Sequence, residues 1–173
     1  MKLRNLPLLL AITAGLASTT AQAAITGNLN FTGVVNAGTC NLATGDENRT
    51  ITLPTVKVSD FDNSNSPAGQ EFELTANCES DLKFVYFLFA GTPSTGDGTL
   101  FANTGTSRGT ALSLAHPGIA YIPANGTPAQ RTRQISTSAG KAVLPLIAKY
   151  HTTGAAITAG TFASAVTVSI TYN

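Results

Sequence analysis

The C-terminal segment alternates apolar and polar side chains up to the final position. From Gly160 the sequence continues Thr-Phe-Ala-Ser-Ala-Val-Thr-Val-Ser-Ile-Thr-Tyr-Asn. A period of two is typical of a β-strand that is buried on one face only. Because nothing follows Asn173 that could pair with the outer side of this strand, we expect a strand with one free edge. An ordinary last strand of a closed sandwich would give the same alternation, and that interpretation stays open at this point.

Shorter alternating runs fill most of the remaining chain and are separated by clusters of Gly, Asn, Asp, Pro and Ser. Runs of this kind are typical of an all-β sandwich. The predicted strands cover residues 28–35, 50–58, 70–78, 82–89, 112–122, 142–151 and 162–172. The predicted loops cover residues 60–69, 91–109 and 123–140, and His116-Pro117-Gly118 predicts a bulge or a break inside its strand. No segment of the mature chain has the apolar stripe and caps of a helix.

Residues 1–23 have the features of a secretory signal. Lys2 and Arg4 precede an apolar stretch, and Ala21-Gln22-Ala23 matches a small-residue cleavage site. The apolar stretch has about 11 residues, whereas a membrane-spanning helix needs roughly 20. An N-terminal membrane anchor is the alternative. We therefore expect an exported protein whose mature chain begins at residue 24.

Export would place the two cysteines in an oxidising compartment. We expect Cys40 and Cys78 to form one disulfide, with two free thiols as the alternative. In the chain-entropy model, closing a loop of about 38 residues stabilises a fold by roughly 3–4 kcal/mol.

Composition and motifs argue against several other classes of function. Apolar residues make up 43% of the chain, which argues against intrinsic disorder. The chain has ten basic and nine acidic residues, and this balance argues against nucleic acid as a partner. His116 and His151 are the only histidines, and no nucleophile, metal or nucleotide motif accompanies them. We predict a protein that is not an enzyme and holds no cofactor or metal. Arg131 and Arg133 are interpreted as part of a solvated loop, with a small cationic patch as the alternative.

Residues 24–39 precede the first cysteine and also alternate. Small or apolar residues recur at every second position from Ile25 to Gly33, with Asn and Thr between them. The outer half is either more of the first strand, a frayed terminus, or a free strand whose apolar side chains fit a groove. A gap at one end of the chain and a matching strand at the other would let each molecule complete the next one. Such a contact is heterologous and propagates as a fibre.

At these positions the sequence resembles the pilin subunits of the chaperone–usher pathway, of the type 1 fimbrial kind. Phe31-Thr-Gly-Val-Val-Asn-Ala-Gly-Thr-Cys40 is similar to the run around the first cysteine of that family. Phe72-Glu-Leu-Thr-Ala-Asn-Cys78 and Leu146-Ile-Ala-Lys-Tyr150 resemble two further strand motifs. Gly160 and the penultimate Tyr172 resemble its C-terminal signature. The resemblance covers essentially the whole mature chain.

The resemblance implies an all-β, incomplete immunoglobulin-like sandwich (the pilin fold) that lacks its last strand and is completed by a strand donated from a neighbour. It implies an N-terminal arm over residues 24–39 and a pilin domain over residues 40–173. The donor residues carried over are Ile25, Gly27, Leu29 and Phe31. The residues carried over for the acceptor groove and the chaperone-binding strand are Gly160, Phe162, Val166, Val168, Ile170, Tyr172 and Asn173.

The implied function is that of a structural fimbrial subunit that polymerises head to tail and contributes to adhesion. The implied partners are a periplasmic chaperone, an outer-membrane usher and neighbouring pilins, with a host receptor as a further candidate. The implied location is a fimbria on the cell surface, reached through the periplasm. The alternative is a minor tip or adaptor subunit, or a single-domain adhesin that binds a host glycan.

Overall fold

The computed structural model describes residues 29–173, so the predicted signal segment and the donor residues Ile25 and Gly27 lie outside the described residues. The chain divides into one unit that ends at Val34 and a second unit from Val35 to Asn173, and each is described by itself. In the first unit, residues 29–34 form no helix or strand. Leu29 and Phe31 are 83% and 88% exposed.

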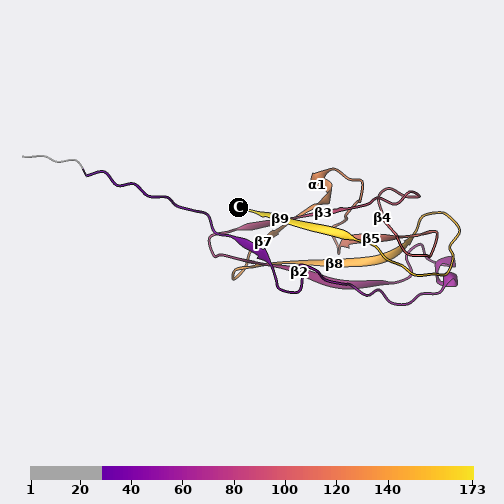
Figure 1. Ribbon diagram of the computed structural model, residues 1–173. Coiled ribbons are helices and arrows are strands. Elements are labelled where there is room, and N and C mark those ends of the chain that lie inside the picture. The colour runs from indigo at the N-terminus through magenta and orange to yellow at the C-terminus, as the bar shows by residue number, and fades with distance from the viewer. Residues whose placement is uncertain (1–28) are drawn as a thin grey trace, which may run out of the picture. The chain divides into compact units, whose positions relative to one another are not determined.

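The second unit is a sandwich of two antiparallel sheets (Figure 1). One sheet has the order β1-β2-β8-β5-β4, with β6 paired to β5, and the other has the order β7-β3-β9. The strands are β1 Cys40–Leu42, β2 Gly69–Cys78, β3 Phe84–Gly91, β4 Phe101–Ala102, β5 Thr110–His116, β6 Ala120–Tyr121, β7 Thr132–Ser136, β8 Lys141–Thr152 and β9 Val166–Tyr172. A 3-10 helix η1 covers Val58–Asp62 and a short helix α1 covers Pro128–Arg131. Among residues 29–173, no helix is long and apolar enough to span a membrane.

The core lies between the two sheets because alternate residues of each strand point inward. The inward residues of β3 are Val85, Phe87 and Phe89, and all three are buried. They pack against the inward rows of β2, β5 and β8, whose buried members are Leu74, Ala76, Leu112, Leu114, Ala142, Leu144, Leu146 and Ala148. The predicted alternation in 70–78 and 142–151 therefore corresponds to real core-facing rows.

A disulfide joins the first two strands. Cys40 lies directly opposite Cys78 in the register of β1 and β2, with 4.1 Å between their Cα atoms. The predicted pairing is confirmed. The bond fixes β1, which has only three residues, to the edge of the larger sheet.

Two predicted strands are absent because no neighbouring strand pairs with them. The first is the predicted strand over residues 28–35. Residues 29–39 form no strand, and β1 begins only at Cys40. Residues 50–57, which we call the strap, also form neither helix nor strand. Ile51, Leu53 and Val56 of the strap are half-buried. Its apolar pattern therefore reflects the burial of side chains, although its backbone is not part of a sheet. Pro54 lacks the N–H that a central strand requires.

The ends of three other strands differ from their predicted bounds. β3 runs two residues further toward the C-terminus than the predicted 82–89. The predicted strand 112–122 is interrupted by a turn after His116 and continues as β6, so the predicted break is confirmed. β9 begins at Val166 rather than at residue 162, because residues 158–163 bond instead to the loop 104–108.

The predicted loop 123–140 contains α1 and β7, which the sequence interpretation missed. α1 begins after Thr127, whose hydroxyl accepts a hydrogen bond from the N–H of Gln130. The sequence of β7, Thr-Arg-Gln-Ile-Ser, does not show the apolar alternation of a strand, because Arg133 occupies its inward position opposite Phe87. The interpretation of Arg133 as part of a solvated loop was wrong, since this residue lies in β7 and is only 8% exposed.

Arg133 connects the two sheets through backbone carbonyls. Its Nη2 donates to the carbonyl of Tyr121 in β6 at 2.6 Å, and its Nη1 donates to the carbonyl of Gln130 at 2.9 Å. His116, at the end of β5, is also buried, and its Nδ1 has no hydrogen-bond partner. Burial, together with the charge of Arg133, lowers the pKa of His116 below its ordinary value. The folded state therefore favours the neutral imidazole.

This arrangement predicts a pH dependence of stability. Because the pKa of His116 is lower in the folded than in the unfolded chain, its contribution to stability is present above about pH 6.5 and is lost as the pH falls below that value. Replacing His116→Gln should flatten the decrease of the urea unfolding midpoint between pH 7 and pH 4. His151→Gln, at the only other histidine, is the matched control. Equal pH profiles for the wild type and His116→Gln would contradict the prediction.

Candidate functional site, a groove beside the last strand

The last strand, β9, has one paired edge and one free edge. It pairs with β3 alone among the described residues, with Val168 opposite Phe89 and Ile170 opposite Phe87. Asn173 and Phe84 exchange two backbone hydrogen bonds of 3.3 Å. In an antiparallel pair, hydrogen-bonded positions alternate with positions whose N–H and C=O point the other way. The backbone groups of Val166, Val168, Ile170 and Tyr172 therefore face the free edge.

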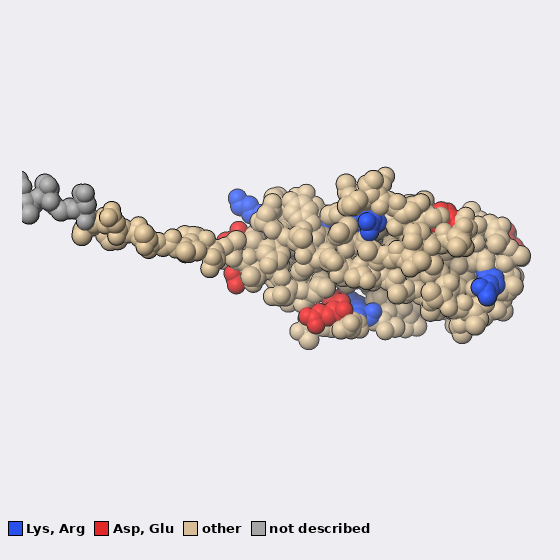
Figure 2. Space-filling view, turned by 45° about the horizontal axis from the view of Figure 1, so that its top comes forward, with Lys and Arg blue, Asp and Glu red and all other residues tan. Residues whose placement is uncertain are grey.

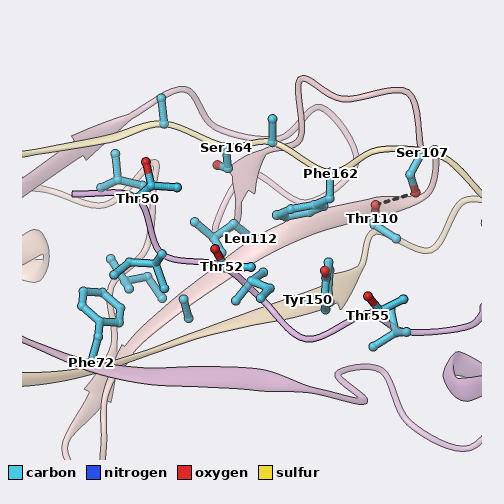
Figure 3. Close-up of a pocket in the computed structure, with 18 of the residues that line it drawn as sticks. Thr50, Thr52, Thr55, Phe72, Ser107, Thr110, Leu112, Tyr150, Phe162 and Ser164 are labelled. Atoms are coloured by element: carbon cyan, nitrogen blue, oxygen red, sulfur yellow. Dashed lines mark hydrogen bonds between the residues drawn. The ribbon is translucent and has the colours of Figure 1, made fainter. Parts of the chain in front are cut away.

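A groove with a volume of about 1120 Å³ lies beside this edge. One wall is formed by residues 157–168, and the facing wall is formed by the strap and the residues just before it. The apolar residues of the surrounding strands that line it are Phe72, Leu74, Phe89, Leu112 and Leu114. Figure 3 shows Phe162 and Ser164 on one side of this space, with Thr50, Thr52 and Thr55 along the strap.

The wall segment before β9 packs against β8. Phe162 packs its ring edge-on against Tyr150, with 4.8 Å between ring centroids, and burial raises the pKa of the Tyr150 hydroxyl. The Oγ of Ser164 is buried without a hydrogen-bond partner. Ser164 is thus a polar position in the row that runs from Phe162 to Val168, and its hydrogen-bonding capacity is unmet.

Gly160 is required by the close approach of two backbones. A Cβ at this position would collide with the Ser107 amide nitrogen and lie 2.7 Å from the Thr106 carbonyl carbon. Around it, the N–H of Ser107 donates to the carbonyl of Thr161, and the N–H of Thr104 donates to the carbonyl of Ala163. Gly160 therefore lets this loop hold one wall of the groove in place.

The structure brings only part of the predicted acceptor set into the groove. Gly160, Phe162, Val166 and Val168 line it. Ile170 continues the half-buried row against the core but lies outside the groove lining, and Tyr172 is 38% exposed. Asn173 is exposed, and its carbonyl accepts hydrogen bonds from Lys83 and Phe84. The assigned roles of all these residues stay predictions.

The sequence interpretation missed the strap as a wall of the groove. Its half-buried residues Ile51, Leu53 and Val56 alternate imperfectly and flank Pro54. Pro54 was the sequence signal that this segment is not a paired strand, because proline within an apolar run indicates an edge strand or an unpaired segment.

The groove is suited to binding an extended chain. Its free backbone groups on β9, beside a row of apolar side chains, match the needs of an added β-strand. On the face drawn in Figure 2, charged side chains are few, and some acidic and basic ones lie side by side.

Comparison with known proteins gives the family. An immunoglobulin-like sandwich whose last strand has one unpaired edge is the pilin class of fold. A family model described as "Fimbrial protein" matches residues 29–173, and the chain belongs to this family. The minor fimbrial subunit HifD of Haemophilus influenzae is 32% identical, in an alignment that covers 87% of this chain and 76% of HifD.

Two solved structures have the same fold at low sequence identity. The P pilus rod subunit PapA has a TM-score of 0.64 at 18% identity, covering 78% of this chain and 99% of PapA. A chain in a structure of a chaperone–usher pilus has a TM-score of 0.65 at 19% identity, covering 91% of this chain and all of that one. The predicted family and fold class are confirmed. The protein is a structural subunit of a surface fimbria, where it assembles with neighbouring pilins.

The packing around Gly160 generates a testable prediction. Gly160→Ala should lower the free energy of unfolding by about 1–3 kcal/mol, because an added methyl group must push two backbones apart. The measurement is urea denaturation. Gly33→Ala is the matched control, since a Cβ at Gly33 meets no atom within 4 Å. Equal unfolding midpoints for Gly160→Ala and the wild type would show that the loop does not hold this wall.

Proposed function

We propose that this subunit polymerises head to tail by donor-strand exchange. The arm of one copy, with Ile25, Gly27, Leu29 and Phe31 facing inward, fills the groove beside β9 of the next copy. The single observation that carries the proposal is the free edge of β9 beside an apolar groove. A contact of this kind uses different surfaces on the two copies, so it does not close on itself and extends into a fibre.

The energetics favour a long-lived contact. Leu29 and Phe31 are large apolar residues that are more than four-fifths exposed. Burying an apolar side chain of this size stabilises a complex by ~1.5–3 kcal/mol. The backbone groups of Val166, Val168 and Ile170 add a ladder of hydrogen bonds on the free edge. Gly27 would lie where the groove is too narrow for a side chain.

The proposal includes the steps that precede assembly. Residues 1–23 act as a secretory signal, residues 24–39 form the donor arm and residues 40–173 form the pilin domain. A periplasmic chaperone first covers the free edge, because an exposed apolar edge promotes aggregation. An outer-membrane usher is the place of exchange. The role is structural, without catalysis.

The second candidate is a minor subunit at the tip or at an adaptor position. The likeness to HifD, a minor fimbrial subunit, supports this alternative. Donor-strand exchange applies to both positions, since each subunit must still receive a strand from its neighbour.

The parity of the arm provides a direct test of donor-strand exchange. The double substitution Leu29→Asp and Phe31→Asp should abolish fibre growth, because two carboxylates would have to enter an apolar groove. Deleting residues 24–31 should have the same effect, while both variants fold and bind the chaperone as the wild type does. Electron microscopy and size-exclusion chromatography measure the outcome.

The matched control changes the outward-facing positions of the same arm. Asn30→Asp together with Thr32→Asp adds the same charge but should leave fibre growth within a few-fold of the wild type. Equal loss of fibres in both double variants would point to an effect of charge alone. Normal fibres from the variant without residues 24–31 would rule out the arm as donor.

A further inference from the structure

We propose that Asp46 and Arg49 are positioning residues that hold the strap in place as the second wall of the groove. This inference rests on the proposed strand exchange, because it assigns these residues a role in forming the acceptor groove. Neither residue needs to touch the donor side chains. They act through the segment that follows them.

Asp46 and Arg49 are bound to each other and to the neighbouring strand β2. Arg49 Nη1 lies 3.1 Å from Asp46 Oδ1 and donates to the carbonyl of Glu73 at 2.8 Å. The second carboxylate oxygen of Asp46 accepts the backbone N–H of Thr75 at 2.9 Å. The pair therefore fastens the start of the strap to the edge of the larger sheet, and we call these contacts the clasp.

The clasp also touches the groove lining. The Arg49 guanidinium carbon lies 5.9 Å from the centroid of the Phe72 ring, within the range of a cation–π contact. Phe72 lines the groove and packs against the core. The position of Arg49 is thus coupled to the shape of the groove at this end.

At its far end, the strap leads directly into η1. The N–H of Lys57 donates to Asp60 Oδ2 at 2.8 Å, and the N–H of Asp60 donates to the carbonyl of Lys57 at 3.1 Å. Between the two ends, residues 47–56 make no backbone–backbone hydrogen bond to any other described residue. Beyond the clasp, the strap is held by its half-buried side chains.

This anchoring explains why an exposed ion pair has more than a surface role. An isolated surface pair contributes little to stability. Here Asp46 is mostly buried, with 10% of its side chain exposed, and three of the contacts reach β2. Loss of the clasp would leave the sandwich core intact and free one wall of the groove to move.

The test compares clasp variants with control variants in the exported chain. Asp46→Asn and Arg49→Met should slow fibre growth about tenfold. Hydrogen exchange measured by mass spectrometry on the unassembled subunit should become faster in the peptide covering residues 47–57. Exchange in β8 and the paired edge of β9 should stay unchanged, which separates this role from a general loss of stability.

Two control variants complete the design. Glu71→Gln and Lys141→Gln change exposed charges on β2 and β8 that lie outside the groove lining. Both should grow fibres within about twofold of the wild type. Wild-type exchange rates in the 47–57 peptide of both clasp variants, with normal fibre growth, would overturn the proposed role. If the wild type itself forms no fibres, strand exchange fails, while strap exchange in the unassembled subunit still decides the role of the clasp.

Discussion

The unpaired edge of β9 is the constraint on which the rest of this structure depends. A sheet edge carries N–H and C=O groups that need partners, and here the same strand also presents a half-buried apolar row. The loop 104–108 and the close approach at Gly160 hold the chain before β9 in place. The paired edge on β3 fixes the direction in which the free groups point. The fold thus keeps open a site that an ordinary sandwich would close with its own strand.

The two walls of the groove differ in how they are built. The β9 wall belongs to a sheet and shares its hydrogen bonds, whereas the strap depends on the contacts of Asp46 and Arg49 before it and on its half-buried side chains. A rigid wall and a lightly held wall together suit the proposed exchange of one bound strand for another. The buried hydroxyl of Ser164 lies in the rigid wall, where an incoming strand would meet an unmet hydrogen bond.

Much of this architecture could be predicted from the sequence, because a half-buried strand alternates apolar and polar residues. The predicted bounds of β2 and β8 agree with the structure to within one residue at each end, and the predicted pairing of Cys40 with Cys78 is also correct. β7 did not, because the apolar stem of Arg133 fills a core position while its guanidinium reaches carbonyls that only the fold provides. The strap was assigned as a strand because its side chains are buried like those of a strand, although its backbone has no partner. A sequence pattern reports burial directly and pairing only indirectly.

Residue-resolved amide exchange along β9 tests the central claim most directly. In the unassembled subunit, the amides of Thr167, Ser169 and Thr171 should be protected by β3, while those of Val168 and Ile170 exchange rapidly. In assembled fibres all five should be protected, because a neighbour's strand would then occupy the free edge. The same alternating pattern in subunits and fibres, with Val168 and Ile170 still unprotected, would contradict the account.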